Sequence, residues 1–133
     1  MFGADTNRDE NMLEAAYNSE IVHDLLLNTM YHLKDELNPK GFKPEKFDSI
    51  YKWNHKESTV EHYLKSTLTQ TLRIGNQEII IEGNQEFNIL NSRKMSIDSI
   101  ESYLNKERIY ITEIVTLDND NSNKFSMIIA QKM

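Results

Sequence analysis

Apolar residues recur at steps of three and four through the N-terminal part of the chain. This spacing places them along one face of an α-helix. The residues on that stripe are Met12, Ala15, Ser19, Val22, Leu26, Met30, Leu33 and Leu37. Asn38-Pro39 follows at once and ends a helix, because a residue before proline avoids the helical conformation. The pattern predicts one long helix over residues 8–37.

The next segment, residues 42–55, has a shorter apolar pattern. Pro44 suits the first position of a helix, where its missing N–H is not needed. Phe47, Ile50 and Tyr51 then form one small apolar face. The segment therefore reads as a connector that contains a short helix.

From Val60 onward the period changes from 3.6 to 2, which is typical of a β-strand. Residues at even positions between 60 and 74 are mostly apolar, and those at odd positions are charged residues, threonines and one tyrosine. This alternation predicts one long strand over residues 60–74. A helix over residues 59–65 followed by a strand over residues 66–74 is the alternative.

Two short segments then repeat the same four residues. Gly75-Asn76-Gln77-Glu78 recurs eight residues later as Gly83-Asn84-Gln85-Glu86. A Gly-Asn pair favours a two-residue hairpin turn, because glycine readily adopts positive φ. The repeat therefore predicts two turns of a meander, with strands over residues 78–82 and 86–90.

The C-terminal part predicts a helix over residues 96–106, with Ser96 as its N-cap, and two final strands joined by a polar turn at residues 118–123. The predicted fold class is α+β, in a single domain over residues 1–133. Its helical region, about residues 8–55, is a long N-terminal helix and a short helix. These pack on an antiparallel sheet of about five strands over residues 58–133, with one helix inserted between strands 3 and 4.

Composition narrows the function classes. The 133 residues contain no cysteine, which excludes disulfides, cysteine–zinc sites and a thiol nucleophile. No apolar stretch has the length of a membrane helix, so we expect a cytoplasmic protein that does not interact with membranes. The frequent asparagine, lysine and isoleucine suggest an AT-rich genome, bacterial or phage.

The net charge of -6 is unevenly distributed. Residues 1–36 contain eight acidic and two basic residues, whereas residues 40–56 contain five lysines and two acids. A broad basic surface for nucleic acid is therefore absent, and direct nucleic-acid binding is not expected. No glycine-rich phosphate loop is present either, so no cofactor is predicted.

Two segments have some features of a metal site. The acidic turn at residues 118–123 resembles a calcium loop, but Asn123 stands where glycine is needed and Ile129 where a bidentate glutamate is needed. Glu20 and His23 have the spacing of one carboxylate–histidine pair, whereas a ferritin-like site needs two such pairs. No metal site is predicted.

The outer side of the first predicted helix combines tyrosines with acidic residues, which is typical of a protein contact surface. The residues concerned are Tyr17, Glu20, Asp24, Tyr31 and Asp35, and a second cluster contains Tyr51 and Trp53. In the alternative, residues 42–55 fold back over this side and bury the tyrosines. The length, charge and element order are similar to those of small acidic secretion chaperones and toxin-immunity proteins.

These observations favour a non-catalytic protein-binding module, acting as an immunity protein, phage-encoded inhibitor or chaperone that masks a basic partner through its acidic helix face. Homo-oligomers are compatible with this hypothesis, and no catalytic residue is assigned. The alternative is a small-molecule-binding or enzymatic α+β domain with a pocket between helix and curved sheet. His62, Gln70 and Glu113 would line it, with His62 and Glu113 as an acid–base pair.

Overall fold

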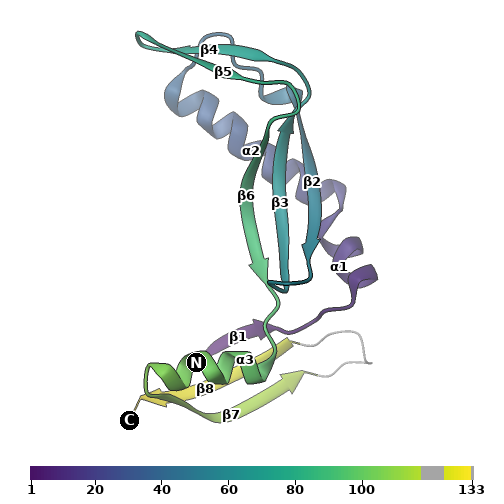
Figure 1. Cartoon of the computed structure of the whole chain (residues 1–133), viewed down its shortest axis with the longest axis vertical. Helices are drawn as coiled ribbons and strands as arrows, with labels where there is room; N and C mark the ends of the chain where they lie inside the picture. Colours follow the sequence, from purple (N-terminus) through teal and green to yellow (C-terminus); the bar gives the residue numbers. More distant parts are fainter. Residues whose placement is uncertain (118–124, 133) are drawn as a thin grey trace.

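The computed structural model describes residues 1–117 and 125–132. In chain order the elements are β1 (Phe2–Asp5), α1 (Glu10–Tyr17), α2 (Glu20–Leu37), the 3₁₀-helix η1 (Pro44–Lys46), β2 (Phe47–Asn54), β3 (Thr59–Ser66), β4 (Gln70–Ile74), β5 (Gln77–Ile81), β6 (Glu86–Arg93), α3 (Ile97–Lys106), β7 (Ile109–Leu117) and β8 (Phe125–Lys132). They form an elongated molecule with two parts (Figure 1).

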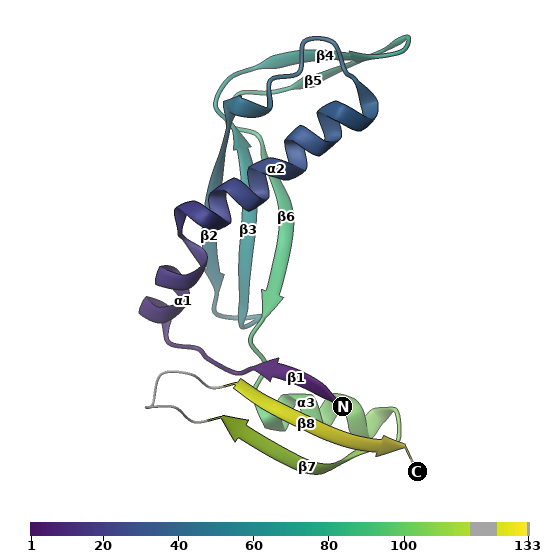
Figure 2. The ribbon, with the colours of Figure 1, turned by 180° about the vertical axis from the view of Figure 1, so that it is seen from behind.

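One part, here called the terminal module, contains elements from both ends of the chain. Strands β1, β8 and β7 form an antiparallel sheet in that order, and α3 packs on one of its faces. The remaining elements, α1 to β6, form the inserted module, which enters the chain between β1 and α3. Both chain ends therefore lie in the same module (Figure 2).

The inserted module is built on the antiparallel sheet β2–β3–β6, and α2 crosses one face of that sheet (Figure 2). The hairpin β4–β5 lies at the end remote from the terminal module. The even residues of β3 are buried and its odd residues, apart from Thr59, are half-buried, as the period of two requires. The main apolar core comprises Leu26, Phe42, Phe47, Leu64 and Leu72.

The prediction of one sheet of about five strands is wrong, because the described strands form three small sheets. The first predicted turn, at Gly75-Asn76, does close a hairpin, since Ile74 pairs with Gln77. The second, at Gly83-Asn84, does not. Its flanking strands β5 and β6 pair with β4 and β3, which belong to different sheets.

The physical reason lies in the backbone at the second turn. Asn84 carries the positive φ of 67°, and its N–H donates to the carbonyl of Ser66 at the end of β3. The chain is thereby directed away from the β4–β5 hairpin and alongside β3. The same four-residue sequence thus produces two different turns, because their surroundings differ.

Three further predictions of local structure are corrected. The long N-terminal helix is interrupted at Asn18-Ser19, where Ser19 is extended and precedes α2 as its N-cap. Both residue types readily leave helices, because their side chains compete for backbone hydrogen bonds. The predicted strand over residues 60–74 is divided into β3 and β4. Strand β1 was not predicted at all.

Residues 42–55 form a 3₁₀ turn and then strand β2, not a short helix. Phe47, Tyr51 and Trp53 are spaced by multiples of two, and pairing with β3 makes this the relevant period. The helical region predicted over residues 8–55 therefore ends at Leu37, apart from the short η1.

Other predictions are confirmed. Helix α3 begins after Ser96, whose Oγ accepts a hydrogen bond from the Ser99 N–H at 3.2 Å. Helix α2 ends at Asn38, which is left-handed with φ of 43°. The two final strands pair antiparallel, while the turn at 118–123 lies outside the described residues. Among the described helices, none has the length and apolar character needed to cross a membrane.

Candidate functional site

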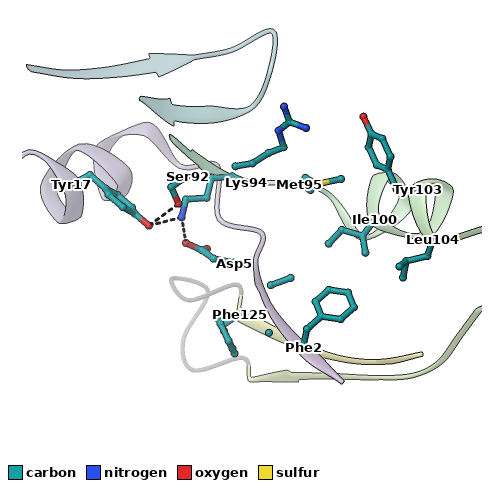
Figure 3. A pocket seen from close by; sticks show the side chains of 13 residues that line it. Phe2, Asp5, Tyr17, Ser92, Lys94, Met95, Ile100, Tyr103, Leu104 and Phe125 are labelled. Atoms are coloured by element: carbon teal, nitrogen blue, oxygen red, sulfur yellow. Dashed lines mark hydrogen bonds and ion pairs between the residues drawn. The ribbon is translucent and has the colours of Figure 1, made fainter. Parts of the chain in front are cut away.

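A cavity of about 640 Å³ lies where the two modules meet. Its apolar walls come from the terminal module: Phe2 of β1, Phe125 of β8, and Ile100, Tyr103 and Leu104 of α3. Its polar end is formed by Asp5 at the end of β1, Tyr17 at the end of α1, and Ser92 and Arg93 at the end of β6, with Lys94 directly after that strand (Figure 3). Binding cavities often lie between structural units in this way.

Lys94 is the centre of the polar end. Its side chain is 2% exposed, and its ammonium donates hydrogen bonds of 2.5 Å to Asp5 Oδ2 and of 2.5 Å to Tyr17 Oη. Both bonds are drawn in Figure 3. A buried ammonium is stable only when charged or polar partners replace its hydration. Asp5, with 37% of its side chain exposed, supplies the compensating charge.

The charge on Lys94 is maintained by these partners. Burial alone lowers the pKa of Lys94, but the hydrogen bonds to Asp5 and Tyr17, together with their charges, outweigh burial and raise it. Lys94 is therefore a fixed cation at neutral pH. The cavity thus has a permanent ion pair at its polar end.

Tyr17 extends this polar network. Its hydroxyl accepts from Lys94 and lies 3.4 Å from Ser92 Oγ, so its own proton is available to Ser92 or to a bound molecule. The Lys94 ammonium also lies 4.5 Å from the centre of the Tyr17 ring. Tyr17 therefore couples the last turn of α1 to both Lys94 and β6.

Two further aromatic residues extend the ring contacts of Tyr17 and do not line the cavity. The His62 ring centre is 5.7 Å from that of Tyr17 and 6.2 Å from that of Tyr51. Within the described residues, His62 Nε2 and Tyr51 Oη are buried without a hydrogen-bond partner. Burial lowers the pKa of His62, so its ring is neutral at neutral pH. Burial, followed by the nearby Glu14 and Glu10, raises the pKa of Tyr51.

The connector between β6 and α3 is held from two sides. The Lys94 N–H donates to the Ser58 carbonyl at 2.7 Å, and the Lys94 carbonyl accepts from Arg8 Nε at 3.1 Å. Ser58 belongs to the β2–β3 turn, and Arg8 belongs to the segment between β1 and α1. Two separate parts of the chain thus fix the backbone of Lys94.

The structure separates the residues predicted as a protein-binding face. Tyr17 lines the cavity. Tyr51 contacts the His62 ring, which in turn contacts Tyr17. Trp53 is half-buried on β2 and contacts His55. The other four residues are exposed along α2: Glu20, Asp24, Tyr31 and Asp35.

The three residues predicted to line a pocket do not meet. His62 is in β3, Gln70 is in β4, and Glu113 is in β7, so each belongs to a different sheet. Gln70 is buried and accepts from the Lys43 N–H at 2.8 Å, which gives it a structural partner. Glu113 is exposed. Of the three, only His62 approaches the cavity, through its contact with Tyr17.

Three residues of the polar end were missed from the sequence: Asp5, Ser92 and Lys94. Asp5 and Lys94 are 89 positions apart, and each stands in a segment without a catalytic motif. The only local signal is the cationic pair Arg93-Lys94 between a strand and the Ser96 N-cap. Nothing in that pair indicates which of the two side chains is buried.

The described residues contain no cluster of His, Asp and Glu side chains suited to a metal ion. No curated protein matches the chain. A family model does match it, over residues 1–132, and is described as histidine-specific methyltransferase, SAM-dependent. This match overturns the hypothesis of a non-catalytic inhibitor, immunity protein or chaperone, and it favours the enzymatic alternative. The chain belongs to the family of SAM-dependent, histidine-specific methyltransferases.

Proposed function

We propose that the chain takes part in SAM-dependent methylation of histidine and that the cavity between the two modules binds the methyl acceptor. The observation that carries this proposal is the Asp5–Lys94–Tyr17 network at the polar end of a cavity of about 640 Å³. That volume lies within the range of roughly 300–1,000 Å³ that is usual for small-molecule sites. The family match supplies the reaction and the acceptor class.

The groups at the polar end suit a nitrogen heterocycle that carries an amine. The Asp5 carboxylate accepts hydrogen bonds from N–H groups, and the hydroxyls of Ser92 and Tyr17 both donate and accept. Phe2 and Phe125 offer apolar surface along which a planar imidazole ring packs. A nitrogen must have a free lone pair to accept a methyl group. Hydrogen bonds that the acceptor donates from its N–H groups fix its orientation without occupying that lone pair.

The residues of this chain do not fit the nucleoside of SAM. Nucleoside-binding α/β folds use a glycine-rich loop between a strand and a helix. The four glycines stand elsewhere: Gly3 within β1, Gly41 in the connector after α2, Gly75 in a hairpin turn and Gly83 after β5. Within residues 1–117 and 125–132 no such loop is formed, and the role proposed for this chain concerns the methyl acceptor.

Titration of the full chain with L-histidine, followed by calorimetry, tests this proposal. L-phenylalanine is the reference ligand because it has a similar size but no ring nitrogen. We expect L-histidine to bind at least tenfold more tightly. Ser92→Ala should weaken its binding about five- to tenfold, because one hydrogen bond of roughly 1 kcal/mol is lost.

Tyr31→Phe is the matched control for Tyr17→Phe. Each substitution removes one phenolic hydroxyl, but Tyr31 lies on the exposed side of α2 and does not line the cavity. Tyr17→Phe should weaken histidine binding and Tyr31→Phe should leave it unchanged. Equal affinity for histidine and phenylalanine, or equal effects of the two tyrosine variants, would refute this role for the cavity.

A further inference from the structure

Strand β7 forms one edge of the terminal sheet. Among the described strands it pairs with β8 alone, so the backbone groups on its other side have no strand partner (Figure 1). With nine residues it is also the longest described strand. An edge of this length offers a row of N–H and C=O groups with which another strand can pair.

The side chains of β7 favour such pairing. Seven of its nine residues are β-branched or aromatic, which are the types that fit a pleated sheet best. Natural edge strands are often protected from pairing by lysine or proline, and β7 contains neither. Tyr110, Ile114 and Val115 are between 40% and 42% exposed. The edge is therefore long, apolar and accessible within the part of the chain that the structure describes.

Two opposite charges stand at this edge. Glu113 is the single charged residue of β7, and Arg108 precedes the strand directly. Both are exposed, and neither has an ion-pair partner within residues 1–117 and 125–132. Antiparallel pairing of two identical strands brings the start of each toward the later part of the other. Each Glu113 then approaches Arg108 of the second copy, so the edge is complementary in charge to itself.

A β-bulge affects how positions along β7 are counted. The register between β7 and β8 shifts between Ile111 and Glu113, which makes Thr112 the extra residue. The Thr112 hydroxyl donates to the Ile129 carbonyl at 3.2 Å, so the bulge is tied to β8. Two residues of a bulge occupy one position relative to the facing strand. Thr112 and Glu113 therefore count as one position.

With this count, a two-fold axis at Ile111 gives a favourable antiparallel register. Tyr110 then lies opposite Glu113 of the second copy, where its hydroxyl can donate to the carboxylate. Ile109 lies opposite Ile114, which forms a β-branched pair. By symmetry each contact occurs twice. A two-fold axis at Glu113 would instead place two carboxylates opposite each other, which is unfavourable.

We propose that two copies of the chain associate through their β7 edges, antiparallel and about a two-fold axis at Ile111. The two three-stranded sheets then join into one sheet of six strands. Such a contact uses the same patch on both copies, as closed dimers do. No residue of β7 lines the cavity between the modules, so the association leaves that cavity open. The inference is independent of the function proposed for the cavity.

Charge reversal tests the contact. Sedimentation velocity of the full chain over a concentration series should show a monomer–dimer equilibrium. Glu113→Arg and Arg108→Glu should each weaken the dimer roughly tenfold, because each places like charges close together twice. The double variant Arg108→Glu/Glu113→Arg exchanges the two charges and should restore most of the wild-type affinity. Both side chains are exposed, so the fold is preserved.

Glu36→Arg is the matched control, since it makes the same charge change at an exposed position of α2 in the inserted module. It should not weaken the dimer. A general charge effect would act in the opposite direction, because lowering the net charge of -6 reduces repulsion between copies. The proposal is refuted if the chain stays monomeric up to about 1 mM, or if the charge exchange restores nothing.

Cysteine cross-linking tests the register, and the absence of natural cysteines removes any background. The two-fold axis places the two Ile111 Cα atoms about 4.5–5.5 Å apart, which suits a disulfide. Ile111→Cys should therefore form a covalent dimer on mild oxidation, with the fold checked by circular dichroism. Val115→Cys is the control, because that residue lies roughly 20 Å from its copy in this register. Equal cross-linking of both variants, or of Val115→Cys alone, would overturn the proposed pairing.

Discussion

Asp5 and Lys94 form one ion pair, but removing Asp5 should lower the free energy of unfolding more than removing Lys94 does. The Lys94 side chain is 2% exposed and that of Asp5 is 37% exposed. Lys94→Met leaves a carboxylate that water already reaches. Asp5→Asn leaves a buried ammonium without a counter-charge. The second change should therefore destabilise the fold more, although both remove the same contact.

The magnitudes follow from the fate of the remaining charge. Removing one partner of a buried pair costs about 3–5 kcal/mol. The loss of stability in Asp5→Asn has an upper limit, because Lys94 can lose its proton and become neutral. The ordinary pKa of lysine, 10.5, is 3.5 units above pH 7, and each unit costs about 1.36 kcal/mol, so the limit is roughly 5 kcal/mol. Lys94→Met loses charge-assisted hydrogen bonds but adds apolar burial, so about 1–2 kcal/mol is expected.

Urea unfolding at pH 7 measures all three variants. The double variant Asp5→Asn/Lys94→Met should be more stable than Asp5→Asn alone, because it no longer contains the unpaired ammonium. The deficit of Asp5→Asn should shrink as the pH rises from 7 to 10, since the unfolded chain keeps its lysine proton over this range and the folded variant does not. The reasoning is refuted if Lys94→Met is the more damaging single change, or if the double variant is no more stable than Asp5→Asn.

Three further predictions concern stability. Burial lowers the folded-state pKa of His62, so the free energy of unfolding should fall as the pH drops below 6.5, by up to about 1.4 kcal/mol per pH unit. Urea unfolding between pH 7.5 and 5.5 measures this slope, and His62→Phe should flatten it. Gly41→Ala should cost at least about 1–3 kcal/mol, because Gly41 has φ of 85° and a Cβ would meet the Thr71 carbonyl oxygen; an unchanged thermal midpoint would contradict this. Ser96→Ala should cost about 1 kcal/mol through loss of its hydrogen bond to the Ser99 N–H, while Ser96→Thr should restore most of it.

The chain matches a methyltransferase family, although its sequence motifs gave no sign of the polar network in the cavity. The reason is the separation of the polar residues along the chain. Lys94 bonds to Asp5 across 89 positions and to Tyr17 across 77 positions. Sequence patterns report on neighbours within about one turn or one strand pair, so a network of this range has no local signature.

Local sequence is enough to predict the structure of segments whose stability depends on near neighbours. The left-handed end of α2 at Asn38, the Ser96 cap of α3 and the hairpin at Gly75-Asn76 each follow from the conformational preference of a few adjacent residues. Their energies are local, so no distant partner is needed to predict them.

The pairing of strands and the position of the site depend instead on contacts between distant segments of the fold. The identical turn sequences at Gly75 and Gly83 differ because the Asn84 N–H bonds to Ser66 and β6 pairs with β3. Strand β1, four residues long, exists because β8 pairs with it. Lys94 is buried because β1, α1 and the β2–β3 turn converge on it. In each case the decisive free energy comes from burial and hydrogen bonds between distant segments, which no local pattern of residues specifies.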